Sequence, residues 1–146
     1  MHVLYTAEGL ATGDGRNGHG RSADGMIDLD FALPPELGGK GGAANPEQLF
    51  AVGYAVCFHN ALRRVAKEFQ SDVEGSSVSA RVGIGAMDDG RFGIRVSIAV
   101  DLPNTDQATA ERVLARADEI CPYSNATRGN VELSLSVTGA PEENAA

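Results

Sequence analysis

Apolar and polar residues alternate along four stretches of this chain with a period of two, which is typical of half-buried strands. These stretches are residues 27–33, 78–86, 92–102 and 131–137. Val3 and Tyr5 indicate a further short strand near the N-terminus. Asp24-Gly25 and Asp88-Asp89-Gly90 have the composition of hairpin turns, so the pattern predicts antiparallel sheets.

The most distinct predicted element is a helix that begins at Pro46. Asn45 suits the N-cap, Pro46 fits the first helical position, and Gln48 completes a capping box. From 49 to 58 nearly every residue is apolar or small, which predicts burial on all sides, whereas residues 62–69 keep one apolar stripe. We therefore expect a central buried helix that other elements surround.

A second helix is predicted from about Thr105 or Asp106, because apolar residues recur at helical spacing as far as Cys121. Pro122 follows at once and ends it. Strands joined partly by hairpins and flanking two helices indicate an α+β fold. We expect a single domain over residues 1–138 and a polar, flexible C-terminal tail over 139–146.

Composition and charge exclude several classes of partner. The 146 residues include 12 Lys and Arg against 20 Asp and Glu, a formal charge of −8. Such an acidic chain repels phosphate, so we expect neither nucleic acid nor an anionic membrane as a partner. No apolar run approaches the roughly 18 residues of a membrane span. The N-terminal residues also lack the pattern of a secretory signal, and the expected location is the cytoplasm.

One glycine-rich segment matches a known binding motif in its letters only. Residues Gly13 to Gly18 read G-x-G-x-x-G, the fingerprint of dinucleotide-binding proteins. That motif works only between a strand and a helix, whose N-terminus holds the pyrophosphate. Here a further glycine-rich turn and a hairpin are expected to follow, so a mobile loop is the favoured interpretation.

The two cysteines are the candidate reactive groups. Composition alone favours inert burial, because free cysteine is among the most buried residue types. A metal site at Cys57 and Cys121 would lack any local pairing of ligands. His59 points roughly 200° away from Cys57 on the same helix, so it cannot be its base within one chain. Each cysteine lies on the inward face of a different predicted helix, and a transient, catalytic disulfide is therefore also open.

Three runs of the sequence are long enough to be specific. They read N-P-E-Q-L-F-A at 45–51, G-Y-A-V-C-F at 53–58 and C-P-Y-S-N-A-T-R-G-N at 121–130. Together they resemble the organic hydroperoxide resistance (Ohr) family, which has the OsmC-like fold. Shorter segments at residues 4–7, 15–18 and 36–39 fit the same pattern. The resemblance covers nearly the whole chain, from about Leu4 to Val137.

The resemblance implies a cytosolic thiol peroxidase that reduces organic hydroperoxides, including those of fatty acids, to alcohols. Cys57 matches the peroxidatic cysteine, Cys121 the resolving cysteine, Arg16 the arginine of a mobile loop, and Glu47 the glutamate that orients it. The family implies an intertwined homodimer. No metal or bound cofactor is expected. The external reductant would be a lipoyl dithiol, supplied by a lipoylated protein and lipoamide dehydrogenase.

The chemistry of a buried thiol predicts roles for Arg16 and Glu47. A peroxidatic thiol must be ionised, and burial opposes this, so a cation such as Arg16 is required. Glu47 precedes Cys57 by ten residues, a helical rise of roughly 15 Å, and cannot act on that sulfur directly. It either holds Arg16 or, in a two-fold pair of antiparallel helices, approaches the partner subunit's Cys57. We favour the second arrangement.

Two departures from the family pattern lie outside the four candidate residues, so they bear on the tuning of the activity rather than on its presence. Asp118 stands where the family often has histidine shortly before the resolving cysteine, and Ala43-Ala44 replace a frequent Gly-Thr. Two other functions are left open. One is a redox-sensing or ligand-binding module of the same fold without turnover. The other is a structural domain with inert cysteines.

Overall fold

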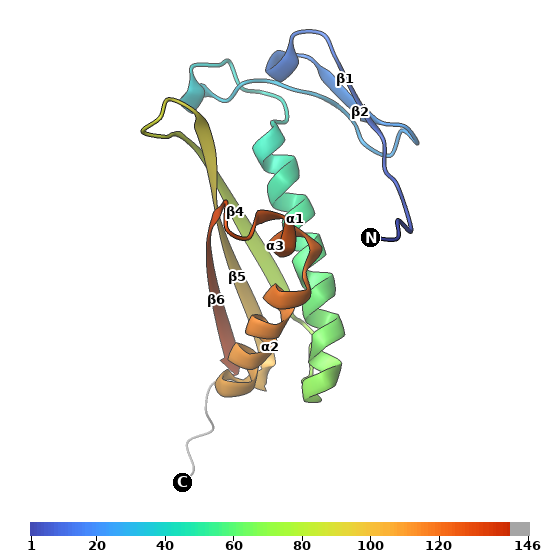
Figure 1. Ribbon diagram of the computed structural model, residues 1–146, viewed down its shortest axis with the longest axis vertical. Coiled ribbons are helices and arrows are strands. Elements are labelled where there is room, and N and C mark those ends of the chain that lie inside the picture. Colours follow the sequence, from blue (N-terminus) through green and yellow to red (C-terminus); the bar gives the residue numbers. More distant parts are fainter. Residues whose placement is uncertain (141–146) are drawn as a thin grey trace. The chain divides into compact units, whose positions relative to one another are not determined.

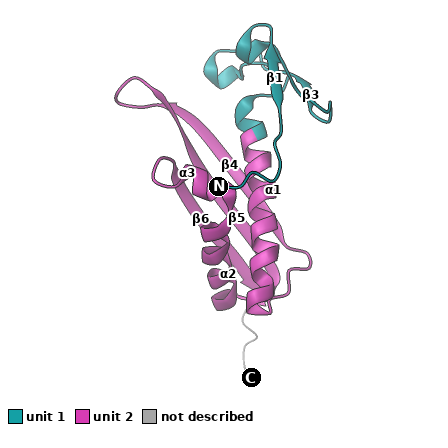
Figure 2. Ribbon diagram, turned by 45° about the vertical axis from the view of Figure 1, so that its right-hand side comes forward, with its two compact units in different colours: residues 1–49 teal, residues 50–146 magenta. Residues whose placement is uncertain are grey.

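The computed structural model describes residues 1–140 of the chain. The chain forms two compact units, Met1–Leu49 and Phe50–Ala146, coloured teal and magenta in Figure 2. Each unit contains one three-stranded sheet, with the orders β1-β2-β3 and β4-β5-β6. Strands and helices together confirm the α+β class. Among the described residues, no helix is both long and apolar enough to cross a membrane.

The first unit holds a small antiparallel sheet (Figure 1). Its strands are β1 (Gly9–Thr12), β2 (His19–Ser22) and β3 (Asp28–Asp30). The prediction of a strand at Val3 and Tyr5 is wrong, and the strand predicted over 27–33 is reduced to three residues. The alternation of β3 does not separate a buried from an exposed face, because all three of its residues are exposed.

The glycine in β2 permits a close contact that the residue pattern does not reveal. A Cβ at Gly20 would lie 2.8 Å from Cε2 of Phe31, so only glycine lets the phenyl ring rest against this strand. Phe31 in turn makes a bridge to Ala44. β1 and β2 contain a single large apolar residue, Leu10, which explains why a search for alternating large apolar residues misses both strands.

The second unit is built on a mixed sheet. Its strands are β4 (Ser77–Ala86), β5 (Phe92–Asp106) and β6 (Glu132–Ala140). β4 and β5 are antiparallel, but β5 and β6 are parallel, which corrects the expectation of antiparallel sheets only. The chain between β5 and β6 passes through helices, and such a crossover returns the next strand in the same direction. β5 also continues past Pro103, at a register shift between Leu102 and Asp106.

Helix α1 (Pro46–Ala66) begins as the sequence predicts. The backbone N–H of Asn45 donates to Oε1 of Gln48 over 3.0 Å, and the N–H of Gln48 donates to Oδ1 of Asn45 over 2.9 Å. This reciprocal pair confirms the capping box. The expected all-round burial of residues 49–58 is wrong within the single chain, because Val52 and Val56 are 64% and 66% exposed.

The core of the second unit lies between α1, β5 and α2. Helix α2 (Gln107–Ile120) starts after Asp106, whose carboxylate accepts the N–H of Thr109 over 2.9 Å, confirming the predicted start. The largest fully buried side chains of this core are Tyr54, Phe58, Leu62, Val65, Val96, Ile98, Leu102, Val113 and Cys121. Burial of this apolar surface holds the helices on the sheet.

A short helix that the sequence pattern does not predict follows α2. Helix α3 (Pro122–Thr127) starts directly after Cys121, so Pro122 ends one helix and opens the next. At the C-terminus, β6 runs through Ala140, and Gly139 and Ala140 are therefore strand residues rather than the start of a tail. The rest of the expected tail, 141–146, lies outside the described residues.

Candidate active site

The two cysteines, 64 residues apart in sequence, come together in the second unit. Cys57 lies in the middle of α1, and Cys121 lies at the corner between α2 and α3. The Cys121 thiol donates to Sγ of Cys57 over 3.9 Å, and both residues are free thiols. Cys121 is fully buried, whereas Cys57 is half-buried. An incoming molecule therefore has access to Cys57 rather than to Cys121.

The corner fixes the backbone of Cys121 on both sides. Its N–H donates to the carbonyl of Ala117 over 2.9 Å, as the last bond of α2. Its carbonyl accepts the N–H of Asn125 over 2.9 Å, as the first bond of α3. The residue itself has φ −66° and ψ 122°, an extended conformation that interrupts the helical path before Pro122. The sulfur is thus carried by a backbone segment with its hydrogen bonds satisfied.

Burial and local hydrogen bonding act in opposite directions on Cys57. Desolvation raises the pKa of the Cys57 thiol, and the neighbouring Cys121 raises it further. The backbone N–H of Tyr123 opposes these effects by hydrogen bonding to the sulfur, which lowers the pKa. Because the thiolate is the nucleophile, this donor favours reactivity while burial opposes it. The contribution of Tyr123 has no signal in the sequence pattern, because a backbone group supplies it.

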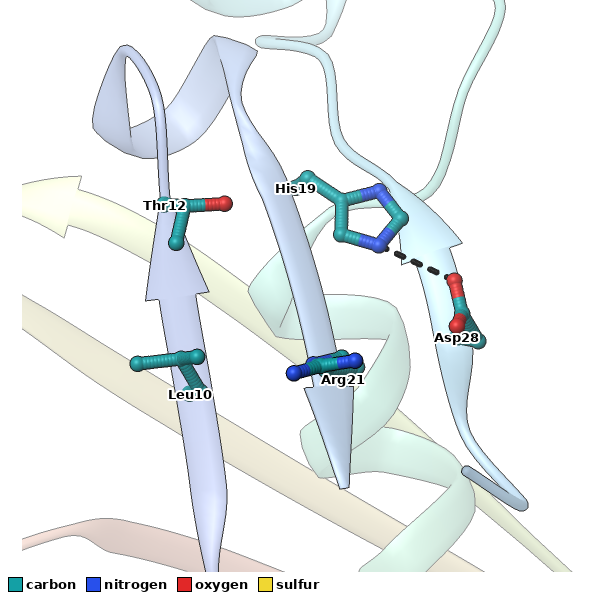
Figure 3. Close-up of a pocket in the computed structure, with 5 residues that line it drawn as sticks. All are labelled: Leu10, Thr12, His19, Arg21 and Asp28. Atoms are coloured by element: carbon teal, nitrogen blue, oxygen red, sulfur yellow. Dashed lines mark ion pairs between the residues drawn. The ribbon is translucent and has the colours of Figure 1, made fainter. Parts of the chain in front are cut away.

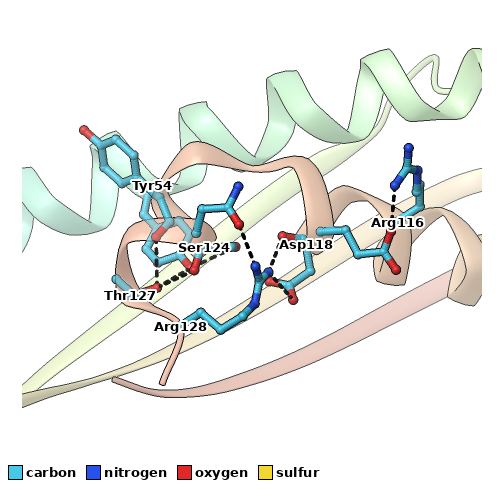
Figure 4. Close-up of polar contacts among 9 residues, drawn as sticks. Tyr54, Arg116, Asp118, Ser124, Thr127 and Arg128 are labelled. Carbon is cyan, nitrogen blue, oxygen red and sulfur yellow. Dashed lines mark hydrogen bonds and ion pairs between the residues drawn. The ribbon is translucent and has the colours of Figure 1, made fainter. Parts of the chain in front are cut away.

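An aromatic cluster lies beside the thiols in the second unit. The rings of Phe50, Tyr54 and Tyr123 have centroid separations of 5.5 to 6.1 Å. A Cβ at Gly53 would lie 3.2 Å from Oη of Tyr123, so α1 presents a small residue where Tyr123 approaches. Tyr54 is completely buried, and its hydroxyl lies 3.0 Å from Oγ of Ser124 (Figure 4). These contacts join α3 to α1 and give the site an apolar wall.

Arg16 and Glu47 form a bidentate ion pair in the first unit. Nη1 of Arg16 donates to Oε2 of Glu47 over 2.9 Å, and Nη2 donates to Oε1 over 2.7 Å. The hydrogen bond from Arg16 lowers the pKa of Glu47, and the bond to Glu47 raises the pKa of Arg16. Both groups therefore stay charged. The structure brings the four predicted residues together as two pairs, one in each compact unit.

The loop that carries Arg16 is a 3-10 turn at Gly15–Asn17. Gly13 and Gly15 have φ of 78° and 52°, a region that favours glycine. A Cβ at Gly18 would clash with the carbonyl oxygen of Thr12, so the turn can close only with glycine at this position. β2 follows the turn instead of a helix, which removes the structural context that a dinucleotide fingerprint requires.

The structure also shows the surroundings of His59 and bears on the hypothesis of a metal site. Nε2 of His59 lies 3.0 Å from Oγ of Ser76, and burial lowers the pKa of this imidazole. Across residues 1–140 no group of three or more His, Cys, Asp or Glu side chains is arranged to hold a metal ion. Within these residues the two cysteines therefore contact each other and are not part of a metal-binding cluster.

Comparisons with known proteins identify the fold and the family. The family model described as OsmC-like protein matches residues 39–136. An organic hydroperoxide resistance protein of Xanthomonas axonopodis pv. citri is 45% identical over 137 residues, which cover 92% of this chain and 95% of that protein. The chain belongs to the OsmC-like family. The resemblance to organic hydroperoxide resistance proteins is thereby confirmed.

Solved structures of OsmC-like proteins agree over nearly the whole chain. A structure of an organic hydroperoxide resistance protein from Legionella pneumophila is 47% identical, has a TM-score of 0.89, and covers 94% of this chain and 99% of its own. OhrB of Bacillus subtilis is 40% identical with a TM-score of 0.84, covering 93% of this chain and 100% of its own. The expected OsmC-like fold is confirmed.

This OsmC-like chain also has an open pocket on its first sheet, lined by Leu10, Thr12, His19, Arg21 and Asp28 (Figure 3). Nε2 of His19 lies 2.9 Å from Oδ1 of Asp28, and Nδ1 lies 2.9 Å from Oδ1 of Asp30. Both ring nitrogens face carboxylates, so the contacts are complete only when both carry protons. The hydrogen bond to Asp30, together with the charges of Asp28 and Asp30, raises the pKa of His19.

We expect this histidine to make the stability of β2 and β3 depend on pH. Because the folded pKa of His19 is raised, the ion pairs stabilise the strands fully below the ordinary histidine value of about 6.5. The stabilisation is lost as pH rises through the raised pKa. Hydrogen-exchange protection of the β2 and β3 amides, corrected for intrinsic exchange, should fall with rising pH. His19→Gln should show low protection at every pH, and equal protection in both proteins at low pH would contradict this role.

Proposed function

We propose that this OsmC-like protein is a thiol peroxidase that detoxifies organic hydroperoxides, including those of fatty acids, by reducing them to alcohols. The observation that carries the proposal is the 3.9 Å separation of the Cys57 and Cys121 sulfurs, with the first half-buried and the second fully buried. The names of relatives at 45% and 42% identity support the same role in the response to oxidative stress.

In the first step the Cys57 thiolate attacks the terminal oxygen of the hydroperoxide. A sulfur–oxygen bond forms and the O–O bond breaks, so that sulfur is oxidised by two electrons to a sulfenic acid. The leaving alkoxide takes a proton and departs as the alcohol. The Tyr123 backbone N–H favours the thiolate against the desolvation that opposes it.

In the second step the Cys121 thiol attacks the sulfenic acid of Cys57. A disulfide forms and the hydroxyl of the sulfenic acid leaves as water. The sulfurs must approach from 3.9 Å to about 2.05 Å, a displacement that side-chain rotation and small backbone shifts can supply. Rapid closure protects Cys57 from a second peroxide, which would give an irreversible sulfinic acid.

Arg16 and Glu47 are proposed as the charged partners of this chemistry. Arg16 supplies a permanent cation with several donors, which stabilises the thiolate and the alkoxide that leaves when the O–O bond breaks. Glu47 orients the guanidinium through two hydrogen bonds, at 2.9 Å and 2.7 Å. The turn at Gly15–Asn17, with glycines on both sides, lets Arg16 move between an open and a closed site.

The reductant and the assembly complete the proposal. An external dithiol reopens the disulfide by thiol–disulfide exchange, and a lipoyl dithiol from a lipoylated protein and lipoamide dehydrogenase is the proposed donor. The reducing cytoplasm is the proposed compartment, because a catalytic disulfide there is transient. The protein works without a bound metal or cofactor. Exposed Val52 and Val56 on α1 support a homodimer in which a second subunit covers this face.

Steady-state consumption of a peroxide tests the function. With dihydrolipoamide as reductant, we expect kcat/KM for a fatty-acid hydroperoxide to exceed that for hydrogen peroxide by at least about tenfold, because the wall of Phe50, Tyr54 and Tyr123 favours an apolar chain. A monothiol should support turnover poorly. Oxidation of the thiols that stops after one equivalent, without steady-state consumption, would instead favour the redox-sensing module.

A further inference from the structure

The end of α3 carries an arginine that reaches back across the corner to α2. Arg128 donates from Nη1 to Oδ1 of Asn125 over 2.6 Å. Its Nη2 donates to the backbone carbonyl of Asp118 over 2.8 Å and lies 3.3 Å from Oδ2 of the same residue (Figure 4). One guanidinium thus holds three acceptors. We refer to Asp118, Asn125 and Arg128 as the corner latch.

The latch provides the missing C-terminal cap of α2. The last carbonyls of any helix have no partner within the helix, and a cation nearby is favourable. The last turn of α2 contains no basic residue of its own. Arg128 therefore supplies from the far end of α3 both a donor to the Asp118 carbonyl and a positive charge. This contact joins the end of α2 to the end of α3.

Asp118 is held in the latch despite a cost. Its Oδ1 is buried and has no hydrogen-bond partner within residues 1–140. A buried, unsatisfied carboxylate oxygen opposes folding, so the contacts of the other oxygen and of the carbonyl with Arg128 must hold the side chain in place. Asp118 and Arg128 lie on either side of Cys121 in sequence, and their contact closes the segment that carries this sulfur.

The opposite side of α3 is anchored to α1. The buried hydroxyl of Tyr54 lies 3.0 Å from Oγ of Ser124 and 3.2 Å from Oγ1 of Thr127. Tyr54 precedes Cys57 by one turn of α1, so this network sets the separation of α3 from the helix of Cys57. The corner around Cys121 is therefore attached to α2 by the latch and to α1 by Tyr54.

We propose that Asp118, Asn125 and Arg128 are positioning residues that hold Cys121 within reach of Cys57, and so govern disulfide formation. The names of the steps rest on the proposed function, but the positioning itself does not. Two thiols held close have a high effective concentration, which favours their disulfide over an open dithiol. Releasing the corner lowers this concentration and leaves the exposure of Cys57 unchanged. The latch thus acts directly on the second oxidation step, and it reaches the first only through the Tyr123 N–H, which belongs to the same corner.

The dithiol–disulfide equilibrium tests the latch without any peroxide. The full-length protein is equilibrated in mixtures of reduced and oxidised dithiothreitol, and the Cys57–Cys121 disulfide is quantified by alkylation and mass spectrometry. For Arg128→Gln we expect a shift of about tenfold towards the dithiol. Asp118→Ala removes only the 3.3 Å contact of the carboxylate and keeps the backbone acceptor, so its shift should have the same direction and a smaller size. Arg128→Lys should fall between Arg128→Gln and the native protein, because lysine keeps the charge but lacks the planar fork.

A matched control is available on the same helix. Arg116 forms ion pairs with Glu119 at 2.7 Å and Glu68 at 3.5 Å, but it makes no hydrogen bond or ion pair to α3 within the described residues (Figure 4). Arg116→Gln removes a charge and two ion pairs from α2, yet the equilibrium should stay within about twofold of the native value. Asn125→Ala removes one contact of the latch, and it is measured in their place if Arg128→Gln or Asp118→Ala folds poorly. It should shift the equilibrium in the same direction by a smaller factor.

Reaction with a peroxide separates the latch from the peroxidase proposal. After reaction with an organic hydroperoxide, a larger fraction of Cys57 should reach the sulfinic acid in the latch variants than in the native protein, whatever the change in the rate of the first oxidation. An unchanged or tighter disulfide in Arg128→Gln and Asp118→Ala would overturn the positioning role. If the native protein consumes no peroxide, the proposed function fails, while the dithiothreitol equilibrium still decides the role of the latch.

Discussion

Cys57→Ser should abolish the steady-state reduction of an organic hydroperoxide, lowering kcat/KM by at least about a thousandfold. The hydroxyl of serine is a far weaker nucleophile than a thiolate, and no other cysteine in the chain is exposed, because Cys121 is fully buried. Loss of peroxide is followed with dihydrolipoamide in excess. Residual turnover near the native rate would exclude Cys57 as the nucleophile.

Cys121→Ser should behave differently, because Cys121 acts after the O–O bond has broken. A single turnover should still oxidise Cys57, and the reaction should then stall at the sulfenic acid or proceed to the sulfinic acid. The presence of Cys121 raises the pKa of Cys57, so its removal should not slow the first oxidation. Rapid-mixing kinetics and the mass of the intact protein distinguish these states. Equal loss of the first oxidation in both variants would contradict the two roles.

Arg16→Gln should lower kcat/KM for the first oxidation by about 10²–10³-fold, the typical cost of removing a charged donor from a developing negative charge. Glu47→Gln should cost less, about tenfold, because glutamine keeps one acceptor but loses the charge and one of two hydrogen bonds to Arg16. Single-turnover oxidation of Cys57 measures both. Arg21→Gln, which changes an arginine of β2, is the matched control and should leave the rate unchanged.

At acid pH the stability that the Arg16–Glu47 ion pair contributes should depend on the ionisation of Glu47. Its folded pKa is lowered, so the ion pair contributes stability above the ordinary carboxyl range and loses it as pH falls through the lowered value.

Mixing Glu47→Gln with Cys57→Ser protein tests which subunit Glu47 serves. Recovery of activity in mixed dimers would indicate that Glu47 supports Cys57 of the partner subunit. A mixture whose activity stays no higher than the Glu47→Gln protein accounts for, after subunit exchange, would place Glu47 and Cys57 in the same subunit.

The start of α1 and much of the second unit could be predicted from the sequence, because their signals are local. The Asn45–Gln48 capping box and the Asp106 N-cap depend on residues three apart, and both form as expected. The alternation in β4 and β5 reflects a sheet with one buried face. The pairing of Cys57 with Cys121 depends on tertiary packing; the inward positions of the two cysteines on their helices left a disulfide open, and the resemblance to a known family favoured it.

The features that were missed depend on contacts that local patterns do not record. Leu10 is the single large apolar residue of β1 and β2, so their pairing leaves no hydrophobic period. The parallel pairing of β6 follows from the crossover through α2 and α3. The Tyr123 N–H at Cys57 and the reach of Arg128 to Asp118 arise only because α3 folds back at Cys121. Single-sequence patterns favour helices and strands over such corners.

The separation of the two cysteines by 64 residues links the oxidation state of the site to the thermal stability of the fold. A cross-link that closes a loop of this length removes chain entropy from the unfolded state worth about 4 kcal/mol at 25 °C. The oxidised protein should therefore unfold at a higher temperature than the reduced protein. By thermodynamic linkage the same free energy favours the disulfide in the folded protein over the unfolded chain, so that the disulfide becomes easier to reduce once the fold is lost.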